Sequence, residues 1–373
     1  MATPVAITLV APTPPSSSAA LTGGYEYNRQ IAAVRSAGGS SPSGADSPGS
    51  PAGHLRSGAA ARYRWVAPAH LGSYLSGSGG VREAVLVDSL FFAYSQLTLP
   101  RRPPRVPVAL LCHVVPWEQW PDDDVSGSLA WLAGAVTTSG ATVAAAAAGL
   151  GRRGCGGPVL AVPPGVDLRR FAPADAEGGG PPAGAATKLI TVANVRRDKG
   201  HLHLMEALAQ LTHHRWRWRI VGDLSQEPDT VRTLRRRAAA LGVEGRLDLV
   251  GSVAGAALVG CYRDADVAVY PTLRESYGMA IVEALACGVP VLASDVGGVA
   301  EAVGGSGAAQ LLSAGDPAAW VAALGRLMAC PGERRRLATT ARGERGDLRS
   351  WDDAAATLTA ATAQLVSAAP SRL

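Results

Sequence analysis

Residues 271–298 read PTLRESYGMAIVEALACGVPVLASDVGG. The stretch predicts a loop that enters a helix over 279–286, because a run that is apolar except for Glu283 lies between Gly278 and Gly288. A short buried strand over 289–293 is expected to follow. The start of such a helix presents backbone N–H groups and the positive end of the helix dipole, which suits a phosphate.

Two carboxylates flank this helix start. Glu275 and Glu283 stand eight residues apart, one before the helix and one within it. Ser276 is the expected N-cap, and Gly278 lets a ligand approach the backbone closely. Carboxylates on either side of a phosphate-binding helix end suit sugar hydroxyls. The pattern therefore predicts a site for a sugar linked through a diphosphate to a nucleoside.

Composition limits the fold and the compartment. The chain has 373 residues, of which 47% are hydrophobic, and this size suits two domains better than one. The five cysteines are odd in number and form no CxxC pair, which argues against a disulfide framework or a zinc site and favours the cytoplasm. We expect no membrane span, and the short apolar run at 5–10 predicts a first strand and not a signal peptide.

The positive charge is carried almost entirely by arginine. The net charge is +5, and the chain has only two lysines, Lys188 and Lys199. The basic runs at 101–105, 235–237 and 334–336 predict solvated helix faces; a peripheral contact with the inner membrane surface is the alternative. Nucleic acid is not an expected partner, because no aromatic residues alternate with these basic runs.

The order of predicted elements indicates two similar domains. Strands and helices alternate through 1–171, apart from a low-complexity loop at 37–60, and again through 188–348. The Gly- and Pro-rich residues 172–187 predict the linker. The segment 349–373 predicts a helix that packs back on the N-terminal domain.

The predicted fold class is α/β, with two doubly wound, Rossmann-like domains that face a cleft. Ligands of such sheets bind at the carboxyl ends of the strands. The first domain would then take the acceptor and the second would take the nucleotide sugar. Ser350 and Asp353 have the spacing of a capping box for the last helix.

Several segments together resemble glycosyltransferase family 4, whose members are retaining enzymes of the GT-B fold. The resemblance is strongest over 159–300. It rests on Val162–Asp167 followed by Phe171, Asn194–Gly200, Ile220–Asp223, the E-x7-E pair Glu275 and Glu283, Asp295–Gly298 with Glu301, and Thr22–Gly24. The family implies a hexosyltransferase-like enzyme whose nucleotide sugar is a substrate, with no cofactor and no metal.

The resemblance also implies roles for individual residues. Glu275 would hold hydroxyls of the transferred sugar, and Glu283 would accept hydrogen bonds from the ribose. Lys199 would neutralise the departing phosphate, and His113 would lie near the reacting sugar carbon. The remaining donor-binding residues would be Ser276, Tyr277, Gly278, Met279, Gly222, Gly23 and Gly24, with backbone N–H groups of 277–279 meeting the diphosphate.

One position departs from the family pattern. The family usually places an arginine five residues before the lysine, and Asn194 stands there in this chain. Arg196 or Arg197 would then supply the second positive charge of the phosphate clamp.

The sequence leaves two alternatives to this enzyme open. One is a catalytically weak relative that serves as a binding or assembly partner, and the other is a nucleotide-sugar epimerase of the same fold. The donor sugar, its nucleotide and the acceptor, whether a sugar, a lipid or another small molecule, are not encoded in any motif of the chain.

Overall fold

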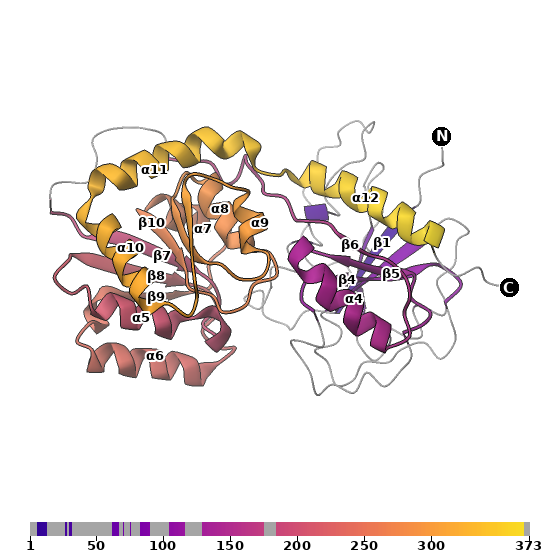
Figure 1. Cartoon of the computed structure of the whole chain (residues 1–373), viewed down its shortest axis with the longest axis horizontal. Helices are drawn as coiled ribbons and strands as arrows, with labels where there is room; N and C mark the ends of the chain where they lie inside the picture. Colours follow the sequence, from indigo (N-terminus) through magenta and orange to yellow (C-terminus); the bar gives the residue numbers. More distant parts are fainter. Residues whose placement is uncertain are drawn as a thin grey trace. The chain divides into compact units, whose positions relative to one another are not determined.

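The computed structural model describes residues 6–12, 27, 30, 31, 62–66, 70, 75, 83–89, 104–115, 129–174 and 184–368. The chain divides into two compact units, one of residues 1–165 with 349–373 and one of residues 166–348 (Figure 1). Each unit carries a six-stranded sheet, and every strand pair in both sheets is parallel. The predicted α/β class is confirmed.

The sheet of the first unit has the strand order β2-β1-β3-β4-β5-β6. Its strands are β1 (Ala6–Pro12), β2 (Arg62–Val66), β3 (Glu83–Asp88), β4 (Val108–Cys112), β5 (Gly134–Thr137) and β6 (Val159–Ala161). The helices that the structure describes over their full length in this unit are η4 (Gly140–Thr142), α4 (Val143–Arg152) and α12 (Trp351–Ala368). Figure 1 shows α4 and α12 on opposite sides of this sheet.

The last helix belongs to the first unit, and it begins with the capping box expected from the sequence. The Ser350 N–H donates to Asp353 Oδ2, and the Asp353 N–H donates to Ser350 Oγ, both at 3.1 Å. The Trp351 ring then meets the Tyr27 ring edge-on at 5.6 Å. The cap therefore fixes the point where the chain turns to lie against the first sheet.

Replacing Ser350 by alanine should lower the free energy of unfolding by about 1 kcal/mol, because it removes the acceptor for the Asp353 N–H. Urea unfolding measures the effect. Ser367→Ala is the control, since its hydroxyl only donates to the Ala363 carbonyl later in the same helix. Equal losses in the two variants would contradict a capping role.

The sheet of the second unit has the order β12-β11-β10-β7-β8-β9. Its strands are β7 (Thr187–Val192), β8 (Trp216–Val221), β9 (Leu247–Gly251), β10 (Val267–Tyr270), β11 (Val291–Ser294) and β12 (Ala309–Leu312). Its helices are η5 (Arg197–Lys199), α5 (His201–Ala209), α6 (Pro228–Ala240), η6 (Glu244–Arg246), α7 (Gly255–Arg263), α8 (Met279–Ala286), α9 (Val299–Val303), α10 (Pro317–Ala329), α11 (Pro331–Gly343) and η7 (Glu344–Asp347).

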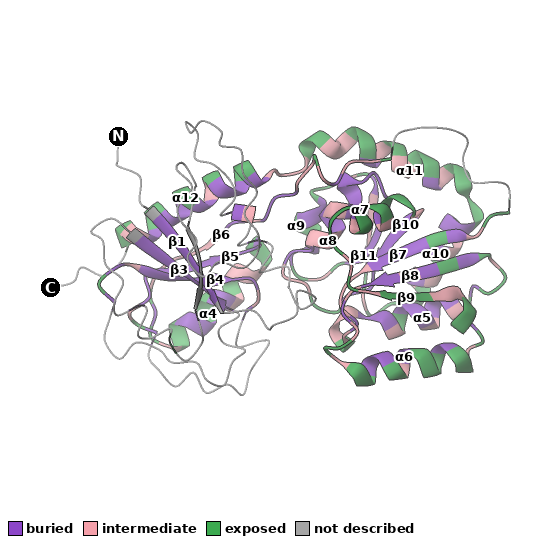
Figure 2. Ribbon diagram, turned by 180° about the vertical axis from the view of Figure 1, so that it is seen from behind, coloured by how far each residue is buried: buried purple, intermediate pink, exposed green. Residues whose placement is uncertain are grey.

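Helices cover both faces of this second sheet (Figure 1). One buried cluster joins α5, α6 and α10 to Trp216, Trp218, Val267 and Val269. The other joins α7, α8, α9 and α11 to alternate strand residues such as Ala268. Successive side chains of a strand point to opposite faces, so each central strand contributes side chains to both clusters. Figure 2 shows these central strands buried along most of their length.

The unit boundary lies earlier than the sequence suggested. The first unit ends at Gly165, six residues before the expected end at 171, so the segment 166–171 belongs to the second unit. Residues 175–183 of the expected linker, the loop 37–60 and the glycines Gly23 and Gly24 lie outside the described residues.

The arginine run 334–336 corrects one prediction. Arg335 and Arg336 are exposed as expected, but Arg334 is buried within α11. Its guanidinium donates to the backbone carbonyls of Leu327 and Met328, near the end of α10. Carbonyls at a helix end have no partner inside the helix, and a buried arginine satisfies them here. No helix among the described residues is long and apolar enough to cross a membrane.

Candidate functional site

The strand order of the second unit places the candidate site. Counted from its first strand, the order is 3-2-1-4-5-6. Successive strands are added to one side of β7 and then, from β10 onward, to the other side, so the strand order reverses between β7 and β10. Ligands of open α/β sheets bind beside such a reversal, at the carboxyl ends of the strands. The turn 194–200 follows β7, and the loop 271–278 follows β10. These segments therefore meet where a ligand is expected.

Lys199 and Glu275 meet at this point. Lys199 Nζ lies 2.8 Å from Glu275 Oε2, and the two side chains are 23% and 24% exposed. Burial opposes the lysine charge, but the charge and hydrogen bond of Glu275 outweigh it and raise the lysine pKa above its usual value. Lys199 is thus a fixed cation over the whole physiological pH range.

Backbone contacts join the turn that carries Lys199 to the loop that carries Glu275. The Leu273 N–H donates to the Asp198 carbonyl at 2.8 Å, and Thr272 Oγ1 lies 3.2 Å from the same oxygen. Gly200 has a φ of +69°, and a Cβ there would collide with the Pro271 carbonyl. Only glycine fits, so the K-G pair of the sequence reflects this close approach.

A second glycine turn fixes the backbone of Glu275. The Glu275 carbonyl accepts a hydrogen bond from the Gly298 N–H at 3.1 Å. Gly297 has a φ of +53°, and a Cβ there would overlap the same carbonyl oxygen. The Gly297–Gly298 pair therefore fixes the position of the Glu275 backbone, from which its side chain extends.

Helix α8 begins as predicted at Met279, but its cap differs from the prediction. Gly278 occupies the N-cap position with a φ of +110°, and no side chain caps the helix. Ser276 is not the N-cap because the chain needs a left-handed residue directly before the helix, and only glycine adopts that conformation without strain. Tyr277 is buried beside it, and the first turn of α8 follows Glu275 by four residues, so its free N–H groups begin next to the loop that carries Glu275.

Glu283 lies within α8 and is held by a tyrosine that the sequence analysis did not select. Tyr262 OH donates to Glu283 Oε2 at 2.9 Å. Tyr262 stands on α7, and no motif of the resemblance includes it. The distance in sequence between Tyr262 and Glu283 matches no known pattern, so only the structure reveals the contact.

The predicted second cation has other partners. Arg196 Nε donates to Asp198 Oδ1 at 3.0 Å and lies 3.7 Å from Glu227 Oε1. Arg197 is exposed, and its backbone N–H donates to Glu227 Oε2. Among these contacts neither guanidinium joins the Lys199–Glu275 pair, although the charge of Arg196 is close enough to lower the pKa of Lys199 as a lesser cause.

Asn194 and Gly222 act on the backbone next to the site. Asn194 Oδ1 accepts a hydrogen bond from the Asp223 N–H at 2.9 Å, which ties the end of β7 to the end of β8. A Cβ on Gly222 would overlap the Ala193 carbonyl, so this glycine allows the same two strand ends to approach. The amide of Asn194 therefore has a structural use where the family has an arginine.

His113 belongs to the first unit, at the carboxyl end of β4. Its Nε2 lies 3.5 Å from Asp88 Oδ2, and its ring meets the Tyr27 ring edge-on at 5.0 Å. Burial lowers the His113 pKa to about 3, so the ring is neutral at physiological pH. The structure thus places a neutral histidine at this strand end and does not bring it together with Lys199 within one unit.

His201 follows the Lys199 turn and should make stability depend on pH. It is 1% exposed and stacks on Trp218, and burial lowers its pKa to about 4. Unfolded His201 binds a proton below about pH 6.5, whereas folded His201 does so only below about pH 4, so stability falls as the pH drops through this window. The loss is about 1.4 kcal/mol per pH unit.

His201→Leu should therefore weaken the acid dependence of urea unfolding between pH 7 and pH 5. His203→Leu is the control, because His203 lies on the exposed side of the same helix. If both variants keep the acid dependence of the unchanged protein, His201 is not its source.

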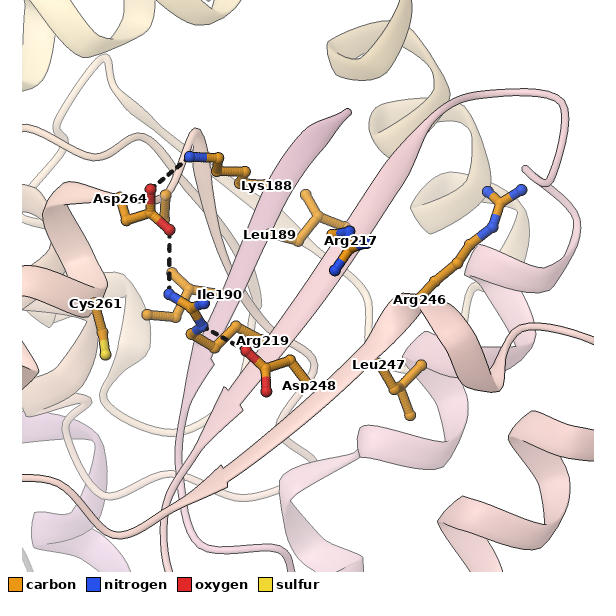
Figure 3. Close-up of a pocket in the computed structure, with 11 residues that line it drawn as sticks. Lys188, Leu189, Ile190, Arg217, Arg219, Arg246, Leu247, Asp248, Cys261 and Asp264 are labelled. Carbon is orange, nitrogen blue, oxygen red and sulfur yellow. Dashed lines mark hydrogen bonds and ion pairs between the residues drawn. The ribbon is translucent and has the colours of Figure 1, made fainter. Parts of the chain in front are cut away.

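A cavity of about 120 Å³ lies elsewhere in this unit (Figure 3). Its lining includes Lys188, Arg217 and Leu247, which stand at the amino ends of β7, β8 and β9, opposite to the candidate site. Arg219 binds Asp248 at 2.8 Å and Asp264 at 3.1 Å there. Because these charged side chains pair with one another, we do not place the nucleotide sugar in this cavity.

Among the residues that the structure describes, no group of three or more His, Cys, Asp or Glu side chains could hold a metal ion.

The two parallel sheets and the strand-end site define the chain as a protein of the GT-B fold. Solved structures agree over nearly the whole length. Sucrose-phosphate synthase from Thermosynechococcus elongatus matches with a TM-score of 0.69 and 20% identity, covering 97% of this chain and 100% of that one. Anabaena HepE, solved with UDP and glucose, matches with a TM-score of 0.63 and 15% identity, covering 96% and 99%.

The family follows from the sequence of the second unit. Residues 181–344 match the family described as glycosyl transferases group 1. The predicted fold is confirmed, and this match agrees with the resemblance seen in the sequence.

Curated relatives carry the name D-inositol 3-phosphate glycosyltransferase. The protein of Xylanimonas cellulosilytica is 36% identical over 221 residues, which are 57% of this chain and 52% of the relative. The protein of Actinosynnema mirum is 36% identical over 220 residues, which are 55% and 52%. The chain thus spans about half the length of the curated relatives it matches.

Proposed function

We propose that the protein is a retaining, metal-independent glycosyltransferase that moves a sugar from a nucleotide sugar to an acceptor. One observation carries the proposal: a lysine held in its charged form at 2.8 Å from a carboxylate, where β7 and β10 end and α8 begins. A cation next to a helix N-terminus stabilises a diphosphate, and the carboxylate accepts hydrogen bonds from sugar hydroxyls.

Each group has a separate task in this proposal. Lys199 and the backbone N–H groups at Tyr277, Gly278 and Met279 stabilise the charge that grows on the departing diphosphate. Glu275 holds the transferred sugar, and Ser276 lines the same loop. Preorganised donors and cations of this kind lower a barrier by about 3–4 kcal/mol each, because they are in place before the charge develops.

The reaction needs no protein nucleophile. The bond from the sugar carbon to the diphosphate oxygen breaks, and the acceptor hydroxyl forms its new bond on the same face. The acceptor proton passes to the departing phosphate. Lys199, with Arg196 released from Asp198, supplies the positive charge that a metal would otherwise supply.

The acceptor is the least constrained part of the proposal. The curated relatives are named for D-inositol 3-phosphate, but the chain spans only about half their length, so this compound is a first acceptor to assay. We place the protein in the cytoplasm, and the exposed arginines of α6 are the surface for any contact with an inner membrane.

A catalytically weak binding protein is the second candidate, and Asn194 is the observation that favours it. Its side chain binds the Asp223 N–H and brings no positive charge to the site. The ion pair of Lys199 with Glu275 suits both candidates, because a charged lysine also helps to bind a diphosphate, and turnover of the donor separates them. An epimerase has no distinct support in these contacts.

A thermal-shift panel of UDP-, GDP- and ADP-glucose tests the proposal. A ligand at about 100 times its dissociation constant adds about 2.7 kcal/mol of stability. We expect one nucleotide class to stabilise the protein and to release its nucleoside diphosphate on incubation. No stabilisation by any donor would contradict the proposal, and binding without turnover would favour the binding protein.

A further inference from the structure

Two buried tyrosines contact the first turn of α8. Tyr262 on α7 and Tyr270 at the end of β10 are 0% and 5% exposed. The Tyr270 hydroxyl donates to the Ala280 carbonyl at 2.7 Å. The Tyr262 oxygen lies 3.1 Å from the same carbonyl oxygen and 2.9 Å from Glu283 Oε2.

Each hydroxyl has one proton, and this decides the direction of the bonds. The Tyr270 hydroxyl donates its hydrogen bond to the Ala280 carbonyl, which lies 2.7 Å away. The Tyr262 proton goes to Glu283, because a carboxylate is a stronger acceptor than a carbonyl that already receives a bond. Burial, followed by the negative charge of Glu283, raises the pKa of Tyr262 well above its usual value, so this proton is always present.

The ring of Tyr262 packs against a second aromatic ring. Phe171 packs against it edge-on, with ring centroids 6.1 Å apart and an interplanar angle of 76°. Phe171 itself is held because its N–H donates to the Asp167 carbonyl at 2.9 Å. The final Phe of the V-P-P-G-V-D-x3-F segment thus holds the tyrosine that contacts Glu283.

We propose that Tyr262 is a positioning residue that fixes the Glu283 carboxylate for the ribose hydroxyls of the donor. One oxygen of the carboxylate accepts the hydrogen bond of the tyrosine hydroxyl, and this contact sets the plane in which the group faces the nucleoside. The inference rests on the proposed function. Tyr262 acts through Glu283 and touches neither the sugar nor the diphosphate.

Tyr262→Phe tests this role with Tyr270→Phe as the matched control. Both changes remove one buried hydroxyl near the Ala280 carbonyl, but only the first removes a bond to Glu283. For each protein, calorimetry measures the dissociation constants of UDP and of 2′,3′-dideoxy-UDP, and GDP or ADP replaces UDP if the thermal panel selects it. The dissociation constant of the dideoxy compound divided by that of UDP reports how well the site recognises the ribose hydroxyls.

We expect Tyr262→Phe to reduce this ratio about tenfold and Tyr270→Phe to leave it unchanged. In a Glu283→Ala background, Tyr262→Phe should have no further effect on the ratio, because the group it positions is gone. Melting curves of both tyrosine variants show that the comparison is made on folded protein, and the assay runs at 10 °C to allow for a lower melting temperature.

The two proposals fail in different ways. An unchanged protein that binds none of the nucleoside diphosphates overturns the proposed function and this inference with it. A protein that binds them, with equal ratios in the unchanged form and in Tyr262→Phe, overturns the positioning role alone. Equal losses in Tyr262→Phe and Tyr270→Phe overturn it as well, since both hydroxyls would then act only by holding α8.

Discussion

Replacing Lys199 by alanine should lower kcat/KM for sugar transfer about 100- to 1,000-fold. The lysine is the one cation that contacts Glu275 in the described contacts of the site, and its raised pKa keeps it charged. Its loss leaves the charge on the departing diphosphate to the helix N–H groups and to Arg196, which pairs with Asp198. Initial rates of nucleoside diphosphate release measure the effect.

The chain offers a matched control for this variant. Lys188 is the only other lysine of the sequence, and it pairs with Asp264 at 2.5 Å at the opposite end of the sheet. Its side chain is 54% exposed, so Lys188→Ala should leave both activity and folding close to those of the unchanged protein. A Lys199→Ala enzyme as active as the Lys188→Ala enzyme would contradict the assigned role.

Gly297→Ala is the second change with a large expected effect. The left-handed backbone costs about 1–2 kcal/mol for alanine, and the new Cβ would also displace the Glu275 carbonyl. Because Glu275 must move, we expect kcat/KM to fall about 100-fold, as a displacement of about 1 Å at a reacting group does. Steady-state kinetics and thermal melting measure the two consequences.

Gly304→Ala separates strain from displacement. Gly304 has a similar φ of +57°, but the nearest atom to its Cβ is the Glu301 carbonyl oxygen at 4.0 Å. The variant should lose the same conformational stability and keep its activity. If Gly297→Ala is no less active than Gly304→Ala, the glycine turn does not set the position of Glu275.

The fold and the candidate site could be predicted from sequence where local signals agree with tertiary structure. The apolar run 279–286 between two glycines gives the observed bounds of α8, and Ser350 with Asp353 forms the expected cap. Lys199 and Glu275 lie 76 positions apart in the chain, yet both follow buried strands. Because carboxyl ends of neighbouring parallel strands share an edge, their meeting follows from topology.

Other features depend on contacts that leave no local pattern. Ser276 has the chemistry of an N-cap, but the backbone before α8 is left-handed, and this requirement selects Gly278. Strand β2 is an edge strand whose sequence alternates arginine with aromatic residues, so its apolar signal is weak. Tyr262 contacts Glu283 only because α7 and α8 pack on the same face of the sheet.

Calorimetric titration with UDP and with uridine tests the central claim most directly, with the guanine or adenine pair if the thermal panel selects it. If the diphosphate binds between Lys199 and the start of α8, the diphosphate should bind at least about 100-fold more tightly than the nucleoside, and Lys199→Ala should remove most of that difference. Equal affinity for nucleoside and diphosphate, or no binding of either, would contradict the account.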